Sequence, residues 1–405
     1  METAIRAVRK HRKDGLQETL SEAIDILYRR KILNSLSKKT VKNSTILTRR
    51  ELRSRAKNID KYYELSNSDE IHVPRKRDVP SEVPIEEVEP DDYGPSFVTL
   101  LEDTTVLGPA GIGRSSDGNL IADTVARPYH AKGRLANGIS RSMKSFGPIR
   151  TWREIKKPGY VEPTKRFDVA CPLIQMWGKN YYHWTAETLT KLRGVEHICE
   201  LLDIDPTLLI PNDPTSWMLE SLNLLGYDEN DLVKFSDFVV EVDRLIVPSY
   251  PGPNASDLQW LRSQMVSGAN EETLLINRSK RIFVDRQDAT RRQITNVNEV
   301  IDLLRDRGFD IIDPGNYSVP EQVEIFSNAD IIIGAHGAGL TNIAYSNNVN
   351  IVELFGQQKR TTFYRIAKLL NHNYTYIENK QSGVDIKVDT TKLRETVDEV
   401  IAGSC

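Results

Sequence analysis

Short apolar runs that alternate with longer segments of helical periodicity define the chain from Phe167 onward. The first series contains FDVACPLI, TLLI and RLIVP, and a second series from Arg281 contains RIFVD, FDIID, ADIIIGA, NIVELF and YTYI. Apolar runs of this length without polar alternation are typical of parallel strands that are buried on both faces. The order therefore predicts an α/β chain with two doubly wound sheets and a cleft between them.

Changes in composition along the 405 residues predict four parts, with enough chain for two cores. Residues 1–65 are predicted to be a basic, helical N-terminal extension, and residues 66–94 a linker rich in proline and acidic residues. Residues 95–272 are predicted to form the first domain, in which Gly-Pro and Asp-Gly turns indicate a β-hairpin lead-in. Residues 273–405 are predicted to form the second domain.

The formal net charge of −3 hides an uneven distribution of charge along the chain. Residues 1–62 contain 17 Lys/Arg against seven Asp/Glu, so the remaining chain is acidic. The basic segment is compatible with a solvated helical face, with a helix packed on the body, or with contact to anionic lipid. A nucleic-acid partner is not expected, because the body that would have to act as its scaffold is acidic.

Cysteine usage and hydropathy bear on where the protein works. Cys171, Cys199 and Cys405 are scattered and show no paired spacing, which disfavours a disulfide framework and a zinc site. We recognise no signal peptide and no membrane-spanning run in the sequence. The expected location is the cytoplasm, with peripheral contact at the inner face of the membrane as an option for the basic segment.

A glycine-rich loop with one histidine, IIIGAHGAGLTNIAY, continues from the third predicted strand of the second domain. Ligands of open parallel sheets bind beyond the carboxyl ends of the strands. Gly334, Gly337 and Gly339 would allow positive φ and close backbone approach, and the helix predicted after them would direct N–H groups at a phosphate. His336 would donate to a diphosphate or to a leaving group. The alternative is a tight turn in which this histidine caps the helix. The pattern differs from the dinucleotide fingerprint G-x-G-x-x-G, which disfavours a dehydrogenase.

Two further features are predicted at the same edge of the sheet. Arg286, Arg291 and Arg292 follow the first strand, and guanidinium groups bind diphosphates through paired hydrogen bonds. The alternative is a solvated basic loop. Glu353 is the one acid in the run NIVELF, and a buried carboxylate requires a partner. A ribose diol and a nearby arginine are both suitable partners.

The first domain contributes the segment NYYHWTAETLTKL. His183 and Glu187 are four residues apart, so on a helix they share a face, and the carboxylate can orient the ring of a general base. The alternative is a helix start packed by Tyr182 and Trp184 with an incidental ion pair. A zinc site is disfavoured because the motif H-E-x-x-H is absent.

Taken together, these motifs resemble a known family. GAHGAGLTN, the upstream NYYHW, the segment DRQDATRRQITNVNEV and the run EQVEIFSNAD are similar to those of glycosyltransferase family 61, over about residues 97–378. The resemblance implies a GT-B architecture of two facing, Rossmann-like, doubly wound domains. It also implies a nucleotide-sugar donor that is commonly a UDP-sugar, inversion at the anomeric carbon and no required metal. No cofactor other than this co-substrate is expected.

Individual residues match the family's motif positions. The matching residues are Arg286, Arg292, Asn296, Gln322, His183, Trp184, His336, Gly337, Ala338, Gly339, Leu340 and Asn342. One departure is NVNE in place of Asn-Glu, which leaves Glu299 as the only acid there. Many relatives are Golgi proteins with a membrane anchor, and because the sequence shows none we expect a soluble, prokaryotic type of enzyme.

The predicted function is that of an inverting hexosyl- or pentosyltransferase. The arginines and the glycine loop would bind the donor diphosphate, with Glu353 on the ribose and His336 at the leaving group. His183 and Glu187 would activate a hydroxyl of a glycan, a lipid-linked glycan or a protein. The alternative is a non-catalytic module that binds a nucleotide or a sugar phosphate.

Overall fold

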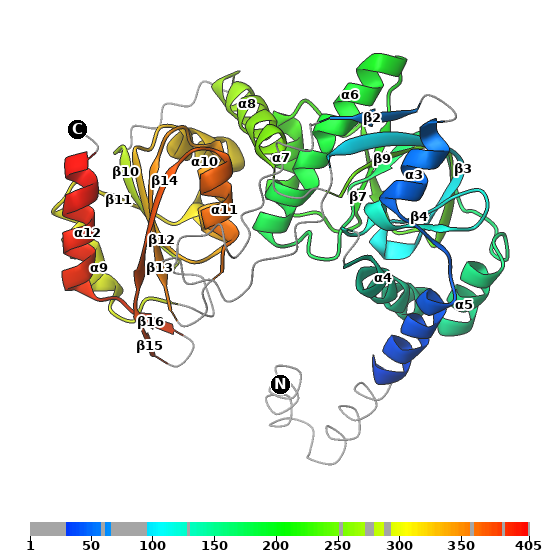
Figure 1. Cartoon of the computed structure of the whole chain (residues 1–405), viewed down its shortest axis with the longest axis horizontal. Coiled ribbons are helices and arrows are strands. Elements are labelled where there is room, and N and C mark those ends of the chain that lie inside the picture. Colours follow the sequence, from blue (N-terminus) through cyan, green and yellow to red (C-terminus); the bar gives the residue numbers. More distant parts are fainter. Residues whose placement is uncertain are drawn as a thin grey trace, which may run out of the picture.

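The computed structural model of the chain is shown in Figure 1. It describes residues 30–57, 61–65, 95–127, 130–250, 254–271, 279–286, 293–356, 360–382 and 385–403. Several predicted features lie outside the described residues: the first 29 residues, the linker at 66–94, Arg291, Arg292 and Cys405.

The first sheet is mixed and contains nine strands among the described residues. Its order is β1-β5-β4-β3-β9-β6-β7-β8, and β2 pairs with β3. The strands β9, β6, β7 and β8 are parallel to one another, whereas β3 runs antiparallel to β9 and to β4. The bounds are β1 Ile46–Leu47, β2 Tyr62–Glu64, β3 Phe97–Leu107, β4 Ile112–Arg114, β5 Leu120–Ile121, β6 Arg166–Pro172, β7 Thr207–Pro211, β8 Leu232–Phe235 and β9 Val239–Pro248.

This sheet confirms the predicted hairpins, because β3 and β4, and β4 and β5, are antiparallel neighbours. The hairpins extend the parallel strands rather than preceding them as a separate unit. Strands β1 and β2 belong to the segment predicted as an N-terminal extension, and both pair within this sheet. Strand β8 was not predicted; it lies at the edge of the sheet and is only partly buried.

Helices pack on this sheet and at its antiparallel end. Residues 30–42 are helical, and the further helices are α3 Arg49–Lys57, α4 Ala131–Phe146, α5 Pro148–Lys156, α6 Leu192–Leu202, α7 Ser216–Leu224 and α8 Ala255–Glu271. Helices α4 and α5 were not predicted, because glycines and serines give α4 a low helix propensity. Burial overrides that propensity: Ala131, Leu135, Ile139 and Met143 recur every four residues and lie in one core.

The second sheet contains five parallel strands among the described residues, in the order β11-β10-β12-β13-β14. The bounds are β10 Arg281–Val284, β11 Asp310–Ile312, β12 Ile331–Ala335, β13 Asn350–Phe355 and β14 Asn373–Glu378. Ile282 and Val284 face the core under α10 and α11, whereas Phe283 faces the core under α9 and α12. The sheet is therefore doubly wound, as predicted.

Helices cover both faces of the second sheet. They are α9 Val297–Arg305, α10 Val319–Ser327, α11 Thr362–Leu369 and α12 Thr390–Gly403, and a small hairpin consists of β15 Lys380–Ser382 and β16 Asp385–Lys387. The strand order reverses between β10 and β12, and ligands bind at such a switch point in open α/β sheets. The segments that follow β10 and β12 are the arginine and glycine–histidine segments of the sequence.

The two sheets share a hydrophobic core through α8, which lies between them in Figure 1. Leu261 and Met265 of α8 pack in the core of the first sheet, and Leu258 packs in the core of the second. Val319 and Tyr345 from the second sheet's side complete the first core. The α/β class is confirmed. Within the described residues, no helix combines the length and the apolar character that crossing a membrane would require.

His372 is expected to give the fold a pH dependence. Burial lowers the pKa of its imidazole to about 4, and Nε2 donates to the carbonyl oxygen of Ile343 at 3.0 Å. The unfolded chain takes up this proton near pH 6.5, so stability falls as the pH drops from there toward 4, by about 3 kcal/mol in total. Urea unfolding at pH 7 and pH 4.5 should show a smaller loss for His372→Gln than for the wild type. Equal losses would contradict the assignment.

Candidate active site

His183 begins a π-helical turn, His183–Thr188, that follows the loop after β6. The structure differs here from the predicted α-helix, but the predicted pair forms: Nδ1 of His183 lies 2.8 Å from Oε2 of Glu187. Single π turns inside helices are frequent at functional sites. Gln175 fixes this turn, because its amide nitrogen donates to the carbonyl oxygen of His183 and to Oγ1 of Thr188.

Glu187 is buried and is held from two further sides. Arg127 Nη2 donates to Oε1 at 3.2 Å, and the hydroxyl of Tyr250 donates to Oε2 at 3.3 Å. Burial acts to raise the pKa of Glu187, but the hydrogen bond from His183 and the charge of Arg127 outweigh it, so this pKa lies below its usual value. The ionised carboxylate accepts Nδ1–H of the histidine, which leaves the Nε2 lone pair outward.

The outer side of His183 is open. Its side chain is 30% exposed, and Nε2 has no hydrogen-bond partner in the part of the chain that the structure describes. An imidazole with one nitrogen fixed on a carboxylate and the other free has the arrangement of a general base.

His336 follows β12 and forms a second pair of the same kind. Its Nδ1 lies 2.5 Å from Oε1 of Glu353 on β13, and its ring stacks on Phe355 with centroids 5.6 Å apart. The hydroxyl of Tyr374 donates to the other oxygen of Glu353 at 2.5 Å. Burial, together with this adjacent carboxylate, raises the pKa of Tyr374 far above its usual value.

This arrangement corrects the predicted role of Glu353. The carboxylate is fully buried, and each oxygen is bound by a side chain of the protein, so neither oxygen is open to a ribose. Its partners are a histidine and a tyrosine rather than an arginine. Parallel pairing places Glu353 opposite Gly334 on β12 and opposite Tyr376 on β14. His336 and Tyr374, each two residues from one of these positions, therefore come within hydrogen-bond distance of the carboxylate.

Arg286 lies against the glycine–histidine segment. Its Nη1 donates to the carbonyl oxygen of His336 at 3.1 Å, and a Cβ added to Gly337 would fall 2.6 Å from its Cζ atom. Gly337 therefore makes room for the guanidinium group. The predicted positive φ angles are not present at Gly334, Gly337 or Gly339. Gly334 and Gly339 instead let the segment pack on Val284, with added Cβ atoms only 3.1 Å from its side chain.

The segment after His336 also departs from the predicted α-helix. Ala338–Tyr345 is a 3₁₀ helix in which Leu340 is fully buried in the core of the second sheet. Leu340 therefore serves packing rather than donor contact. Ala338 and Gly339 are partly accessible, so they can still line a ligand site.

The two histidine–carboxylate pairs lie on one line of ring contacts between the sheets. The ring of His336 is 5.1 Å from Phe363, Phe363 is 6.2 Å from Tyr182, and Tyr182 is 5.3 Å from His183. Two intervening aromatic rings thus connect the imidazoles of His336 and His183. Within the described residues, no group of three His, Cys, Asp or Glu side chains is placed to hold a metal ion.

Comparison with protein families identifies the segment that carries both histidines. The family model Glycosyltransferase 61 matches residues 181–352, which include His183, Arg286 and His336. This match supports the assignment of the segment to glycosyltransferase family 61. The comparison with curated proteins found no match above its threshold.

Two amides at family-matched positions form hydrogen bonds to other parts of the protein. Asn342 accepts a hydrogen bond from the Tyr181 hydroxyl at 2.7 Å and donates one to Oε1 of Gln322 at 2.8 Å. It therefore connects the segment that begins with Tyr181 to helix α10. Asn296 binds the backbone of Val388 through both ends of its amide, each at 2.9 Å. The amide groups of Asn342 and Asn296 thus have protein partners, and their predicted donor contacts remain predictions.

Trp184 of the glycosyltransferase has a similar structural role. Its indole is fully buried and donates to Oγ of Ser221 at 2.8 Å. The carboxylate of Glu299 accepts a hydrogen bond from the amide of Asn296. These residues hold the elements that carry His183 and the arginine segment.

Sequence reasoning did not find several residues that shape the site. They are Arg127, Gln175, Tyr250, Phe363 and Tyr374. Except for Gln175, which lies in the loop just before the π-helical turn, each approaches its partner from an element far away in the sequence, so no local spacing signals it. The apolar run containing Glu353 was the one signal that a buried partner had to exist.

Proposed function

We propose that this glycosyltransferase transfers a sugar from a nucleotide-sugar, of the UDP-sugar class, to a hydroxyl group of a glycan, a lipid-linked glycan or a protein. The observation that carries the proposal is the pair of histidine–carboxylate dyads, His183–Glu187 and His336–Glu353, whose imidazoles are linked by a series of ring contacts. An arginine lies beside each dyad, but Arg127 binds the carboxylate of Glu187, whereas Arg286 binds the backbone carbonyl of His336, which supports different roles for the two dyads.

The proposed acceptor side is the dyad of His183. Its Nε2 removes the proton of the acceptor hydroxyl as the oxygen attacks the anomeric carbon. The bond from this carbon to the diphosphate oxygen breaks at the same time, and its electron pair leaves with the diphosphate. A single displacement from the opposite face inverts the configuration. Glu187 balances the positive charge that develops on the imidazole, and Arg127 and Tyr250 keep the carboxylate in place.

The proposed donor side is the switch point of the second sheet. Arg286 would bind the diphosphate, and His336 as an imidazolium would donate Nε2–H to the leaving oxygen, with its charge balanced by Glu353. Fixed cations at this place support departure of the diphosphate without a metal ion. The two sheets would then act as the acceptor and donor domains of a GT-B architecture, with Arg292 as a further donor contact.

A panel of UDP-sugars tests this function. Release of UDP is measured with a mixed glycan acceptor in buffer containing EDTA, and the anomeric configuration of the product is determined by NMR. We expect release with one donor and inversion at the anomeric carbon. Binding of UDP without any turnover would instead identify a nucleotide-binding module, and activity that EDTA abolishes would refute the metal-free mechanism.

Arg286→Ala should weaken the binding of UDP by about 10- to 100-fold, because a charge-assisted hydrogen bond contributes about 1.5–3 kcal/mol. Arg281→Ala is the matched control: Arg281 lies at the opposite end of β10 and donates to the carbonyl oxygen of Arg307. Calorimetry with UDP should give a changed Kd only for the first variant. The same Kd for both variants would contradict the donor placement.

A further inference from the structure

Three helices form a continuous layer at the antiparallel end of the first sheet. Residues 30–42, α4 and α5 share one hydrophobic core. Ser140 on α4 donates to Asn34 at 3.1 Å, and Lys156 on α5 donates to the carbonyl oxygen of Asn43, just after the first helix. The outer surface of these helices is called the basic face below.

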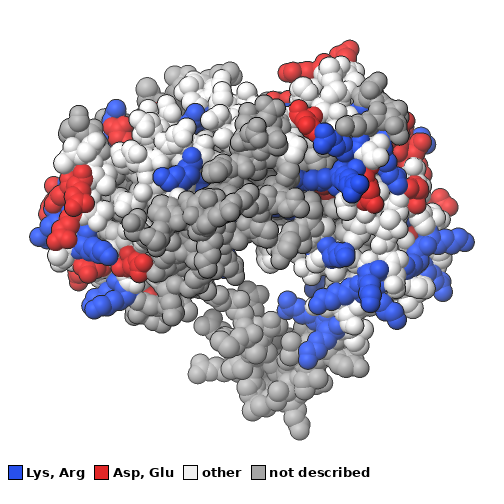
Figure 2. All heavy atoms as spheres, in the orientation of Figure 1, with Lys and Arg blue, Asp and Glu red and all other residues white. Residues whose placement is uncertain are grey.

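The basic face carries positive charge without exposed negative charge. The sequence of the three helices contains one carboxylate, Glu154, which is fully buried and bound to Arg114 at 2.7 Å. None of the cations of the face forms an ion pair within the described part of the chain. They are Arg30, Lys31, Lys38, Lys39, Lys42, Lys132, Arg134, Arg141, Lys144, Arg150, Arg153 and Lys156. Figure 2 shows lysines and arginines gathered at the lower right, where Figure 1 places these helices.

Large apolar side chains are exposed on the same helices. Ile149 and Trp152 on α5 are 66% and 42% exposed, and Ile32 on the first helix is 47% exposed. The buried side of α5 is formed by Thr151, Glu154 and Ile155. Ile149 and Trp152 therefore lie on its solvent side, among the cations of the face. A surface that mixes exposed tryptophan and isoleucine with lysines is typical of helices that lie at a membrane interface. A partner that offered only negative charge would leave these apolar side chains in water.

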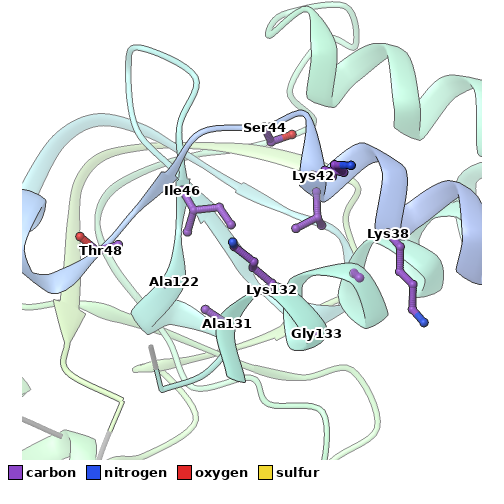
Figure 3. A pocket seen from close by; sticks show the side chains of 11 residues that line it. Lys38, Lys42, Ser44, Ile46, Thr48, Ala122, Ala131, Lys132 and Gly133 are labelled. Carbon is purple, nitrogen blue, oxygen red and sulfur yellow. The ribbon is translucent and has the colours of Figure 1, made fainter. Parts of the chain in front are cut away.

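A pocket of about 590 Å³ opens on this face between the first helix and the start of α4 (Figure 3). Its rim carries Lys38, Lys42 and Lys132, and Val41 and Ile46 belong to its apolar lining. In Figure 3 the Lys132 side chain extends toward Ile46. Lysines around an apolar floor match a phospholipid, which joins an anionic headgroup to acyl chains.

We propose that the basic face binds the anionic surface of a phospholipid bilayer. Its lysines and arginines neutralise headgroups, the pocket accepts one headgroup, and Ile149 and Trp152 enter the interfacial layer. This interaction is separate from sugar transfer and does not depend on it.

The basic face also borders the candidate active site. Arg141 donates to the carbonyl oxygen of Met176 at 3.1 Å, and the guanidinium group of Arg134 lies 5.4 Å from the ring of Trp177. Trp177 lies 6.5 Å from the ring of His183. Binding through this face would place His183 near the bilayer surface, which favours an acceptor presented by a lipid. This last consequence rests on the proposed function.

Vesicle sedimentation with the full chain tests the proposal without any sugar donor. Vesicles of phosphatidylcholine with phosphatidylserine are compared with vesicles of phosphatidylcholine alone. The wild type should sediment only with the anionic vesicles. The triple variant Lys38→Gln, Lys42→Gln, Lys132→Gln should bind them about 100-fold more weakly, and the double variant Ile149→Ser, Trp152→Ser at least about tenfold more weakly.

The matched control removes three exposed cations from the part of the chain that contains the second sheet. The substitutions are Lys280→Gln, Lys392→Gln and Arg394→Gln. It should bind anionic vesicles as the wild type does. Circular dichroism and UDP binding report whether each variant is folded. Equal binding by the wild type and the lysine variant would overturn the proposal. Unchanged binding by the apolar variant, or binding of heparin or DNA in place of vesicles, would also overturn it and identify a polyanion as the partner.

Discussion

His183→Ala is expected to lower the kcat of sugar transfer by about 10²-fold or more, because a positioned general base contributes about 10²- to 10⁴-fold. The affinity for the nucleotide-sugar should change little, since the imidazole faces the acceptor in the proposed mechanism. The variant should fold normally, because the ring is partly exposed and lies outside the cores. Initial rates at saturating donor and acceptor measure the loss.

Two further variants sharpen this result. His197→Ala changes an exposed histidine on α6, outside the dyad, and should keep the wild-type rate. Glu187→Gln keeps a hydrogen-bond acceptor for His183 but removes the charge that balances the imidazolium, so it should lower kcat and shift the pH profile of the rate. An unchanged kcat in His183→Ala would refute the assignment of the base.

His336→Ala is expected to lower kcat by about 10²- to 10³-fold, which is the usual loss when one preorganised donor to developing charge is removed. The charge develops on the diphosphate oxygen, so the loss should depend on the leaving group. A glycosyl fluoride of the same sugar has no diphosphate and should be affected far less than the UDP-sugar. Parallel assays of the two donors measure this difference.

The control for this variant is His372→Gln, which changes a buried histidine on the same side of the molecule that does not face the site. It should keep the wild-type kcat at pH 7. Because removal of His336 leaves a space in a buried layer, His336→Gln and UDP binding verify that the fold persists. Equal losses with both leaving groups would assign His336 to positioning of the substrate rather than to the leaving group.

Much of the fold was predictable because a strand that is buried on both faces has a continuous run of apolar residues in the sequence. A parallel strand such as Ile331–Ala335 reads as a continuous apolar run, and the chain order of such runs predicts α/β units. The same local logic placed His183 and Glu187 four residues apart on one face, and their hydrogen bond is present in the structure. The missed elements, such as α4 and β8, have weak local signals and are stabilised by their neighbours.

The partners of polar side chains were the least predictable part of the site. Glu353 was correctly read as a buried acid, but its bonds to His336 and Tyr374 depend on how β12, β13 and β14 pair. Asn342 matches a family motif, yet its amide is used by Tyr181 and Gln322. A sequence motif shows which residue type stands at a position, but it does not show whether that residue stabilises the fold or binds a ligand. The two roles cannot be distinguished from one sequence.

The sequence by itself determined the class of fold, the family and the two histidines, since periodicity and motif spacing are properties of neighbouring residues. Only the tertiary structure decided which carboxylate faces which histidine, that Arg286 lies on Gly337, and that three basic helices form one face with exposed apolar side chains. These features arise from contacts between segments far apart in the chain. Packing in three dimensions sets such contacts, and no local pattern encodes them.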